Sequence, residues 1–315
     1  MKQTSGSLAG LPEVFMHIRS LPVAFIAAGL ALAPVPTAAQ DSFPDALAAQ
    51  EGATRLEPII AWNIDFGENR CRLTRLFGSE SDRHLIMFEQ GAPGTSFGLT
   101  LAGSGLANFR TAGKVDLGME RDEPLETKDR FGKGQIPDLG PALIFSNIGI
   151  GRAAPPGPLQ AAGLDLEEAA TIDRVVLRRG KTVLSFETGN MKDPLAALNA
   201  CTDDLLVQWG LDPVAHRNHV PPKWINESAV TERIVAVYPS AARRTGEQAI
   251  FRLRVTVETD GSVSDCLIEE STVTQRLESP ACKEMQRAVF EPARDSAGQP
   301  MRSFYATTIT YVIRG

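Results

Sequence analysis

The feature that most constrains the fold is a strand and turn pattern near the C-terminus. Apolar and polar residues alternate strictly over residues 251–258, as is typical of a strand with one buried face. Asp260-Gly261 follows at once, and this dipeptide tolerates the positive φ angles of a two-residue hairpin turn. Residues 263–268 are then expected to return as a second strand. The pattern predicts a β-hairpin whose buried face carries Phe251, Leu253, Val255 and Val257.

A helix and a third strand are predicted after this hairpin. Cys282, Met285 and Val289 recur with the period of a helix and are expected to share its inner face. Pro292 stops the helix, because proline lacks an amide donor and restricts the residue before it. Residues 304–313 are rich in β-branched and aromatic side chains, which predicts the last strand.

The order of these elements resembles the C-terminal domain of TonB-type energy transducers. The pattern consists of Tyr238-Pro239, the V-x-V-x-x-D-G hairpin, a helix that ends in F-x-P-A at residues 290–293, a D-x-x-G-x-P turn at residues 295–300 and the last strand. The resemblance covers residues 232–315. It implies a small α+β domain, a three-stranded antiparallel sheet with helices on one face, in which no residue is needed for chemistry.

The resemblance also implies a partner-binding edge. In transducers the final strand is an exposed edge that takes up an extended peptide from an outer-membrane receptor. In this chain the final strand carries no charge, proline or glycine between residues 304 and 313, which suits strand addition but is an aggregation liability unless the edge is covered. The residues expected to bind the partner are Phe304, Tyr305, Ala306, Thr307, Thr308, Ile309, Thr310 and Tyr311.

The N-terminal segment, residues 1–39, is expected to be a signal peptide. Arg19 precedes an apolar run at residues 21–33, and small residues suited to a signal peptidase end the segment. The run is too short to cross a hydrocarbon core of about 30 Å, so a retained inner-membrane anchor is the less favoured alternative. Met16 makes a more typical start for such a segment than Met1. Export to the periplasm is therefore predicted.

The remaining chain is long for one domain and comfortable for two. Its composition, 43% hydrophobic and 22% charged, excludes wholesale disorder. A net charge of −6 without a basic face argues against nucleic-acid binding. The expected organisation is a β-rich α+β domain of unknown function at residues 40–214 that ends in a helix, a linker at 215–230 and the TonB-like domain at 231–315.

Short alternating runs separated by glycine and proline predict the strands of residues 40–214. A hairpin is expected over residues 172–187, with its turn at Arg179-Gly180. A helix is expected to start at Asp193, as its cap, and to end near Trp209. The other expected strands lie within residues 62–76, 85–89, 97–101, 114–117 and 143–148.

Four cysteines fit an exported protein with two disulfides, for which three pairings exist in principle. Cys266 lies on the second hairpin strand and Cys282 on the inner face of the following helix, so a bond between them is natural. Cys71 is then left for Cys201, on the inner face of the earlier helix. No Cys-x-x-Cys or nearby histidine accompanies them, so neither a metal site nor another cofactor is predicted.

Three patterns resemble catalytic or metal motifs without their context. The G-x-S-x-G sequence around Ser96 is followed by a strand, whereas a nucleophile elbow needs a helix there. Glu187-Thr188-Gly189 lacks the aspartate and the second copy that an aspartic protease needs. His216 and His219 lie among prolines, which predicts solvated linker histidines instead of a base or metal ligands.

The sequence therefore favours a non-catalytic periplasmic protein of a Gram-negative envelope, which binds a protein or an extended peptide by strand addition. An outer-membrane receptor is one candidate partner. The first alternative is a TonB-type energy transducer for receptor transport, although folded sequence occupies the place of the transducer's spacer. The others are an envelope enzyme with its active site in residues 40–214, and an assembly protein that forms a homodimer through its edge strand.

Overall fold

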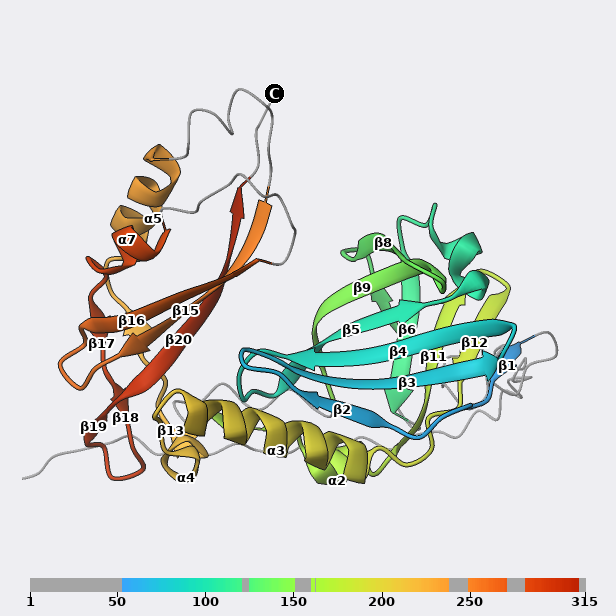
Figure 1. Ribbon diagram of the computed structural model, residues 1–315, viewed down its shortest axis with the longest axis horizontal. Coiled ribbons are helices and arrows are strands. Elements are labelled where there is room, and N and C mark those ends of the chain that lie inside the picture. The colour runs from blue at the N-terminus through green and yellow to red at the C-terminus, as the bar shows by residue number, and fades with distance from the viewer. Residues whose placement is uncertain are drawn as a thin grey trace, which may run out of the picture. The chain divides into compact units, whose positions relative to one another are not determined.

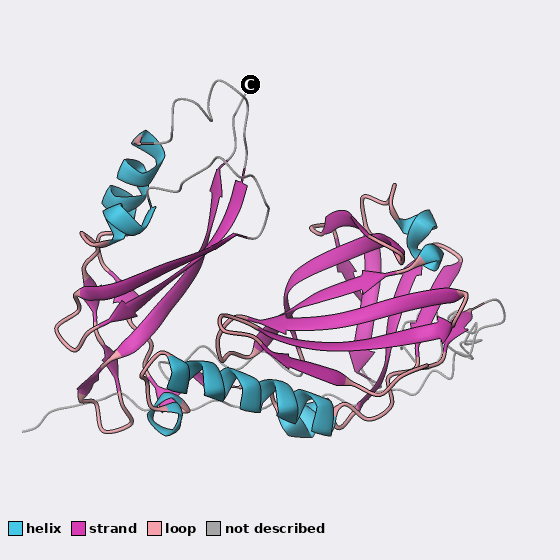
Figure 2. Ribbon diagram, viewed as in Figure 1, coloured by secondary structure: helices cyan, strands magenta, loops and turns pink. Residues whose placement is uncertain are grey.

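The computed structural model describes residues 53–120, 125–150, 160–161, 163–237, 249–270 and 281–311. The predicted signal peptide and its cleavage site lie outside these residues. In the described part of the chain, no helix combines the length and the apolar character needed to cross a membrane. Figure 2 shows that strands are the commonest regular element, with the long helix α3 beside them.

Among the described residues, six antiparallel strands form the larger sheet of the N-terminal region, in the order β2-β3-β4-β5-β9-β8 (Figure 1). Alternation along β3 and β4 buries Leu73, Phe77, Ile86 and Phe88 in the core. The strands are β2 (Asn63–Phe66), β3 (Cys71–Ser79), β4 (Asp82–Gln90), β5 (Ser96–Ala102), β8 (Gly132–Ile136) and β9 (Gly140–Gly149).

A second sheet shares this core and has the order β1-β12-β11-β6-β7 in the part of the chain that is described. The Phe186 ring of β12 lies 5.5 Å from the Phe77 ring of the first sheet. The predicted hairpin of β11 and β12 is present, and β1 adds to it in parallel. The strands are β1 (Thr54–Leu56), β6 (Val115–Glu120), β7 (Glu126–Lys128), β11 (Ile172–Arg179) and β12 (Thr182–Phe186).

Helix α3 (Lys192–Gln208) is the last long element of the N-terminal region, as predicted, but its first residue differs from the prediction. Asp193 is not the cap, because the N-cap is Met191 and the Asn190 side chain accepts the Lys192 N–H at 2.9 Å. Pro194 then falls within the first turn, where its missing N–H costs no helical bond. Short helices α2 (Leu166–Ala169) and η1 (Ser104–Phe109) complete the region.

The C-terminal region has the predicted fold. Its sheet order is β16-β15-β20, with β15 (Ala249–Val257) paired antiparallel to both β16 (Val263–Glu270) and β20 (Ser303–Tyr311). Helices α5 (Glu227–Ala236) and α7 (Ala281–Met285) cover one face of this sheet. Their contacts come from Val230, Ile234 and Met285, which pack with Leu253, Val255 and Val257.

Two local predictions in this region are wrong. Val289 is 52% exposed and does not share the inner face, because α7 already ends at Met285. The hairpin turn is longer than two residues, since the strands end at Val257 and resume at Val263. Of the two turn residues expected to have positive φ, only Gly261 does, at 84°.

The predicted linker histidines are buried rather than solvated. Asp212 caps the short helix α4 (Pro213–His216), where Pro213 is compatible with the first turn. His216 and His219 are only 1% and 8% exposed. Short backbone pairings hold the rest of the segment in place: β13 (Asn218–His219) pairs with β10 (Gln160–Ala161), and β14 (Lys223–Trp224) pairs with β17 (Phe290–Glu291).

Among the described residues, the two larger hydrophobic cores are separate, one within residues 56–205 and the other within residues 230–290. Residues Gln40–Gly315 nevertheless form one compact unit. The division into domains near residue 214 therefore stays a prediction.

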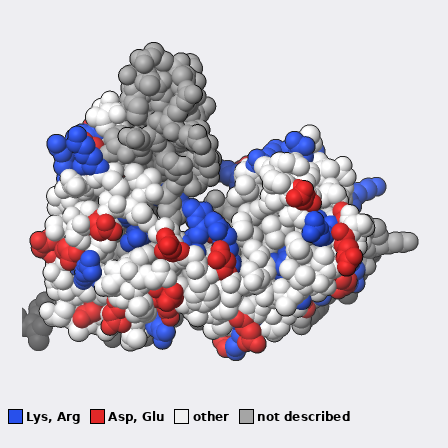
Figure 3. Space-filling model, in the orientation of Figure 1, with Lys and Arg blue, Asp and Glu red and all other residues white. Residues whose placement is uncertain are grey.

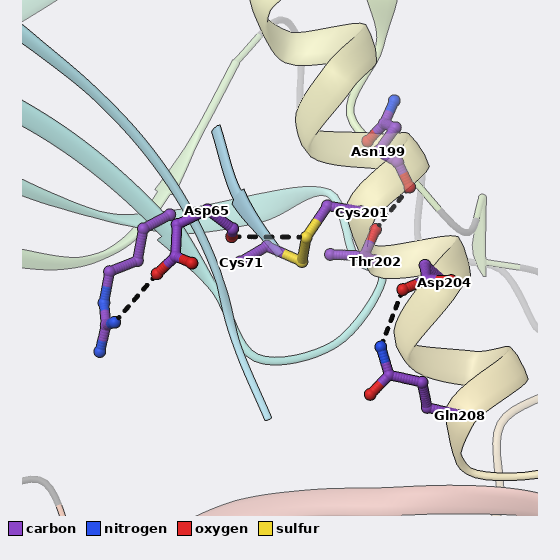
Figure 4. The surroundings of a disulfide bond; sticks show 8 residues. Asp65, Cys71, Asn199, Cys201, Thr202, Asp204 and Gln208 are labelled. Atoms are coloured by element: carbon purple, nitrogen blue, oxygen red, sulfur yellow. Dashed lines mark hydrogen bonds and ion pairs between the residues drawn. A yellow bond between two sulfur atoms is a disulfide. The ribbon is translucent and has the colours of Figure 1, made fainter. Parts of the chain in front are cut away.

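Both disulfides have the predicted pairing. Cys71 of β3 bonds Cys201 of α3 (Figure 4), with a Cα–Cα distance of 5.9 Å. Cys266 of β16 bonds Cys282 of α7, with a Cα–Cα distance of 5.6 Å. Each bond thus ties a helix to the sheet that it covers.

Candidate functional site

Strand β20 is an edge of the C-terminal sheet. Its pairing with β15 is continuous from Ser303 opposite Val257 to Tyr311 opposite Ala249. None of the other described strands pairs with its outer side. The predicted binding residues 304–311 all lie on this strand, and residues 312–313 fall outside the described part.

The two faces of β20 have different surroundings. Tyr305 points into the C-terminal core, with its ring 5.2 Å from Phe290 and 5.7 Å from Trp224. On the opposite face, the Phe304 ring lies 5.4 Å from the ring of Trp209, the C-cap residue of α3. Ala306 is exposed. The face away from α5 and α7 is therefore covered at the start of β20 and opens at Ala306.

A hydrogen-bonded histidine fixes the first residue of β20. His216 Nδ1 lies 2.6 Å from the Asp212 carbonyl oxygen and must donate to it, so the Nε2 of a neutral ring accepts from the Ser303 hydroxyl at 3.0 Å. Ser303 is fully buried. The ring of His219 packs against that of His216 at 4.9 Å. This network places the start of the edge strand.

These two histidines make stability sensitive to mild acid. Burial lowers the pKa of His216 and of His219, although their hydrogen bonds to backbone carbonyl groups oppose the shift. A histidine with a lowered folded pKa contributes fully above its unfolded value of about 6.5, and the contribution is lost as the pH falls towards the folded value. We expect the free energy of unfolding to fall below pH 7, by at most about 1.4 kcal/mol per pH unit for each histidine.

Urea unfolding at a series of pH values measures this slope. The pKa values of Glu89 and Glu258 are lowered, so these carboxylates stay ionised between about pH 6.5 and pH 5 and add no slope there. The double variant His216→Gln, His219→Gln should have a flatter profile in this range. An unchanged slope would assign the acid sensitivity to other groups.

A cluster of arginines around Glu89 joins β15 to β4. The Glu89 carboxylate accepts a hydrogen bond from Arg252 at 2.6 Å and another from Arg72 at 3.0 Å. The Arg70 guanidinium lies 3.5 Å from the same carboxylate. Burial by itself would raise the pKa of Glu89, but these guanidinium groups outweigh it and lower the pKa. Glu89 is therefore ionised at neutral pH, and Arg72 also pairs with Asp65 at 3.5 Å. On the face shown in Figure 3, basic and acidic side chains are interspersed, and a group of basic ones lies near the middle.

Alternation along β15 predicts only that Arg252 and Arg254 lie on its polar face. The structure shows that both contact residues of the N-terminal region. Arg252 donates to Glu89, and the Arg254 guanidinium lies 3.9 Å from the centre of the Trp209 ring. No local pattern indicates these contacts, since Arg252 and Glu89 are 163 residues apart.

The motif-like patterns do not assemble into an active site. Ser96 is the first residue of β5, so a turn precedes it and a strand follows. Glu187 follows β12 directly and pairs with Arg55 at 3.2 Å. Within the described residues, no three His, Cys, Asp or Glu side chains are grouped in a way that could hold a metal ion.

The comparison with protein families decides the nature of the C-terminal region. Residues 235–313 match the family of the Gram-negative bacterial TonB protein C-terminal. The region that resembles transducers in sequence is thus a TonB C-terminal domain. A comparison with curated proteins found no match.

Proposed function

We propose that this protein is a non-catalytic component of the Gram-negative periplasm, which binds an extended segment of an envelope protein along β20. The observation that carries the proposal is that no described strand pairs with the outer side of β20, an edge strand of the TonB C-terminal domain. Such an edge offers backbone N–H and C=O groups to an incoming strand, and side chains on alternate positions add specificity. An outer-membrane receptor is the partner class that the TonB family suggests.

The described structure supports a binding protein over the alternatives. Two disulfides fit an oxidising compartment such as the periplasm. The described residues between 53 and 209 form two sheets and the helix α3, where a transducer would have an extended spacer. The patterns at Ser96 and Glu187 lack catalytic geometry, so an enzyme has less support.

Proline substitutions at two neighbouring threonines of β20 test strand addition. Successive N–H groups of a strand point to opposite sides. One of the two variants, Thr307→Pro or Thr308→Pro, therefore removes an N–H that points outward, and the other removes an N–H that bonds to β15. The melting temperature tells them apart, because loss of a ladder bond destabilises the sheet. We expect the variant with the smaller loss of melting temperature to lose partner binding.

The measurement is capture from detergent-solubilised envelopes on beads that carry the mature chain, with bound proteins identified by mass spectrometry. The more stable proline variant should lose the partner that the wild type captures. If both variants fold and keep every wild-type partner, strand addition at β20 is wrong. If sedimentation shows a wild-type dimer that this variant abolishes, the strand at the edge is that of a second copy.

A further inference from the structure

A short turn at one end of the N-terminal region presents cations to the solvent. The turn follows η1, and its backbone is held where Phe109, Ala112 and Val115 are buried in the core. Arg110 and Lys114 lie between these buried residues, and both are exposed. The two charged side chains therefore project from a backbone that the core fixes.

Two further cations are held beside this turn by uncharged groups. Arg179, the last residue of β11, donates to the Asn108 carbonyl oxygen. Lys133 of the edge strand β8 donates to the Ala112 carbonyl oxygen at 2.7 Å, and its ammonium group lies 5.4 Å from the centre of the Phe131 ring. Carbonyl oxygens and aromatic rings position a cation without cancelling its charge. Both charges therefore remain available to an external anion.

We call this group of five cations the basic patch: Arg110, Lys114, Lys133, Arg179 and Lys181. Lys181 is exposed in the turn that joins β11 to β12. In Figure 3, basic side chains gather over this end of the N-terminal region, near β8 in Figure 1. The sequence shows no basic run here, because the five residues come from three segments that only the fold brings together.

No ion pair within the described residues neutralises a member of the basic patch. Asp116 is engaged elsewhere, since it pairs with Arg178 at 3.0 Å. The neighbours Asp129-Arg130 add no net charge, and Asp138 lies beyond the far end of β8. Charges more than about 8 Å apart are largely screened at physiological ionic strength, so the net charge of −6 on the whole chain does not cancel this local excess.

The arrangement of the cations fits a flat anionic surface. They project from the turn at residues 110–114, from the edge strand β8 and from the turn of the β11–β12 hairpin. An extended peptide follows one strand or groove, whereas a plane of charge can meet all three segments at once. An anionic bilayer presents such a plane of phosphate groups and attracts Lys and Arg within about one Debye length of its surface.

We propose that the basic patch is a contact surface for the phosphate headgroups of an anionic membrane. The contact is peripheral and reversible, because it uses charge and inserts no apolar segment. It gives the N-terminal region a role of its own, which does not depend on strand addition at β20.

Flotation with lipid vesicles tests the basic patch in the full mature chain. The protein should bind vesicles of phosphatidylglycerol and phosphatidylcholine in equal parts, but not vesicles of phosphatidylcholine alone, and added sodium chloride should release it. The triple variant Arg110→Gln, Lys114→Gln, Lys181→Gln should bind the anionic vesicles roughly tenfold more weakly. Lys133 and Arg179 are left unchanged, because they also hold the backbone of the turn.

A second triple variant controls for the loss of total charge. Lys223→Gln, Lys283→Gln and Arg294→Gln remove three positive charges from exposed positions outside the basic patch, and this variant should bind the anionic vesicles as the wild type does. Equal weakening by the two triple variants, or equal binding to neutral vesicles, would overturn the proposal. If the wild type binds soluble poly-glutamate through the basic patch but does not bind anionic vesicles, the partner is an acidic polypeptide and the membrane contact is wrong.

Discussion

Replacing both Cys71 and Cys201 with alanine is expected to lower the free energy of unfolding by about 5 kcal/mol. The bond closes a loop of 130 residues, and both cysteines are buried where α3 meets β3. In the loop-entropy model, the cost of freeing the unfolded chain grows with the length of the closed loop. Denaturation by guanidinium chloride under non-reducing conditions measures the loss.

The second disulfide is a matched control for this prediction. Cys266 and Cys282 are only 16 residues apart, so the double alanine variant should lose about 3 kcal/mol. Each pair joins a sheet to its helix, but Cys266 and Cys282 are only half-buried, so a smaller cavity adds to the effect of the shorter loop. An equal or larger loss at the shorter loop would show that loop closure does not set these energies.

The C-terminal fold could be predicted because its signals are local. The alternation that buries Leu253, Val255 and Val257 involves one strand, and the partner strand follows after a short turn. The Cys266–Cys282 pairing then follows from the two elements that carry these residues. The ordered motifs also suffice to recognise the TonB C-terminal domain.

The contacts around the candidate site could not be predicted, because residues far apart in sequence make them. His216 meets Ser303 across 87 positions, and Arg252 meets Glu89 across 163. The prolines near His216 and His219 predict a solvated linker, but His216 ends the short helix α4 and His219 lies in β13, and both side chains are buried. The position of β1 beside β12, in parallel, likewise depends on the complete fold.

The Asp260-Gly261 motif correctly predicts a hairpin turn but not the length of that turn. Asp260-Gly261 does form the turn, but the Asp260 side chain accepts hydrogen bonds from the N–H and the hydroxyl of Ser262. These bonds stabilise a longer turn in which Gly261 alone has positive φ. The Gly261 carbonyl also accepts the Phe290 N–H at 3.0 Å, a contact that no local pattern indicates.

Gly261→Ala is therefore expected to destabilise the TonB C-terminal domain by more than about 3 kcal/mol. A Cβ atom at this position would lie 1.9 Å from the Phe290 carbonyl oxygen, and the φ angle of 84° disfavours any L side chain. The backbone of Phe290 has little room to retreat, because its ring packs between Trp224 and Tyr305. Chemical denaturation followed by far-ultraviolet circular dichroism measures the loss.

Gly298→Ala separates the steric clash from the cost of the backbone angle. Gly298 has a φ angle of 79°, close to that of Gly261, but no atom lies within 4 Å of the Cβ that alanine would add. This variant should lose only about 1–2 kcal/mol, the cost of a left-handed conformation. Equal losses at both positions would mean that the turn shifts away from Phe290 without cost. In that case the bond between Gly261 and Phe290 would not hold the hairpin in place.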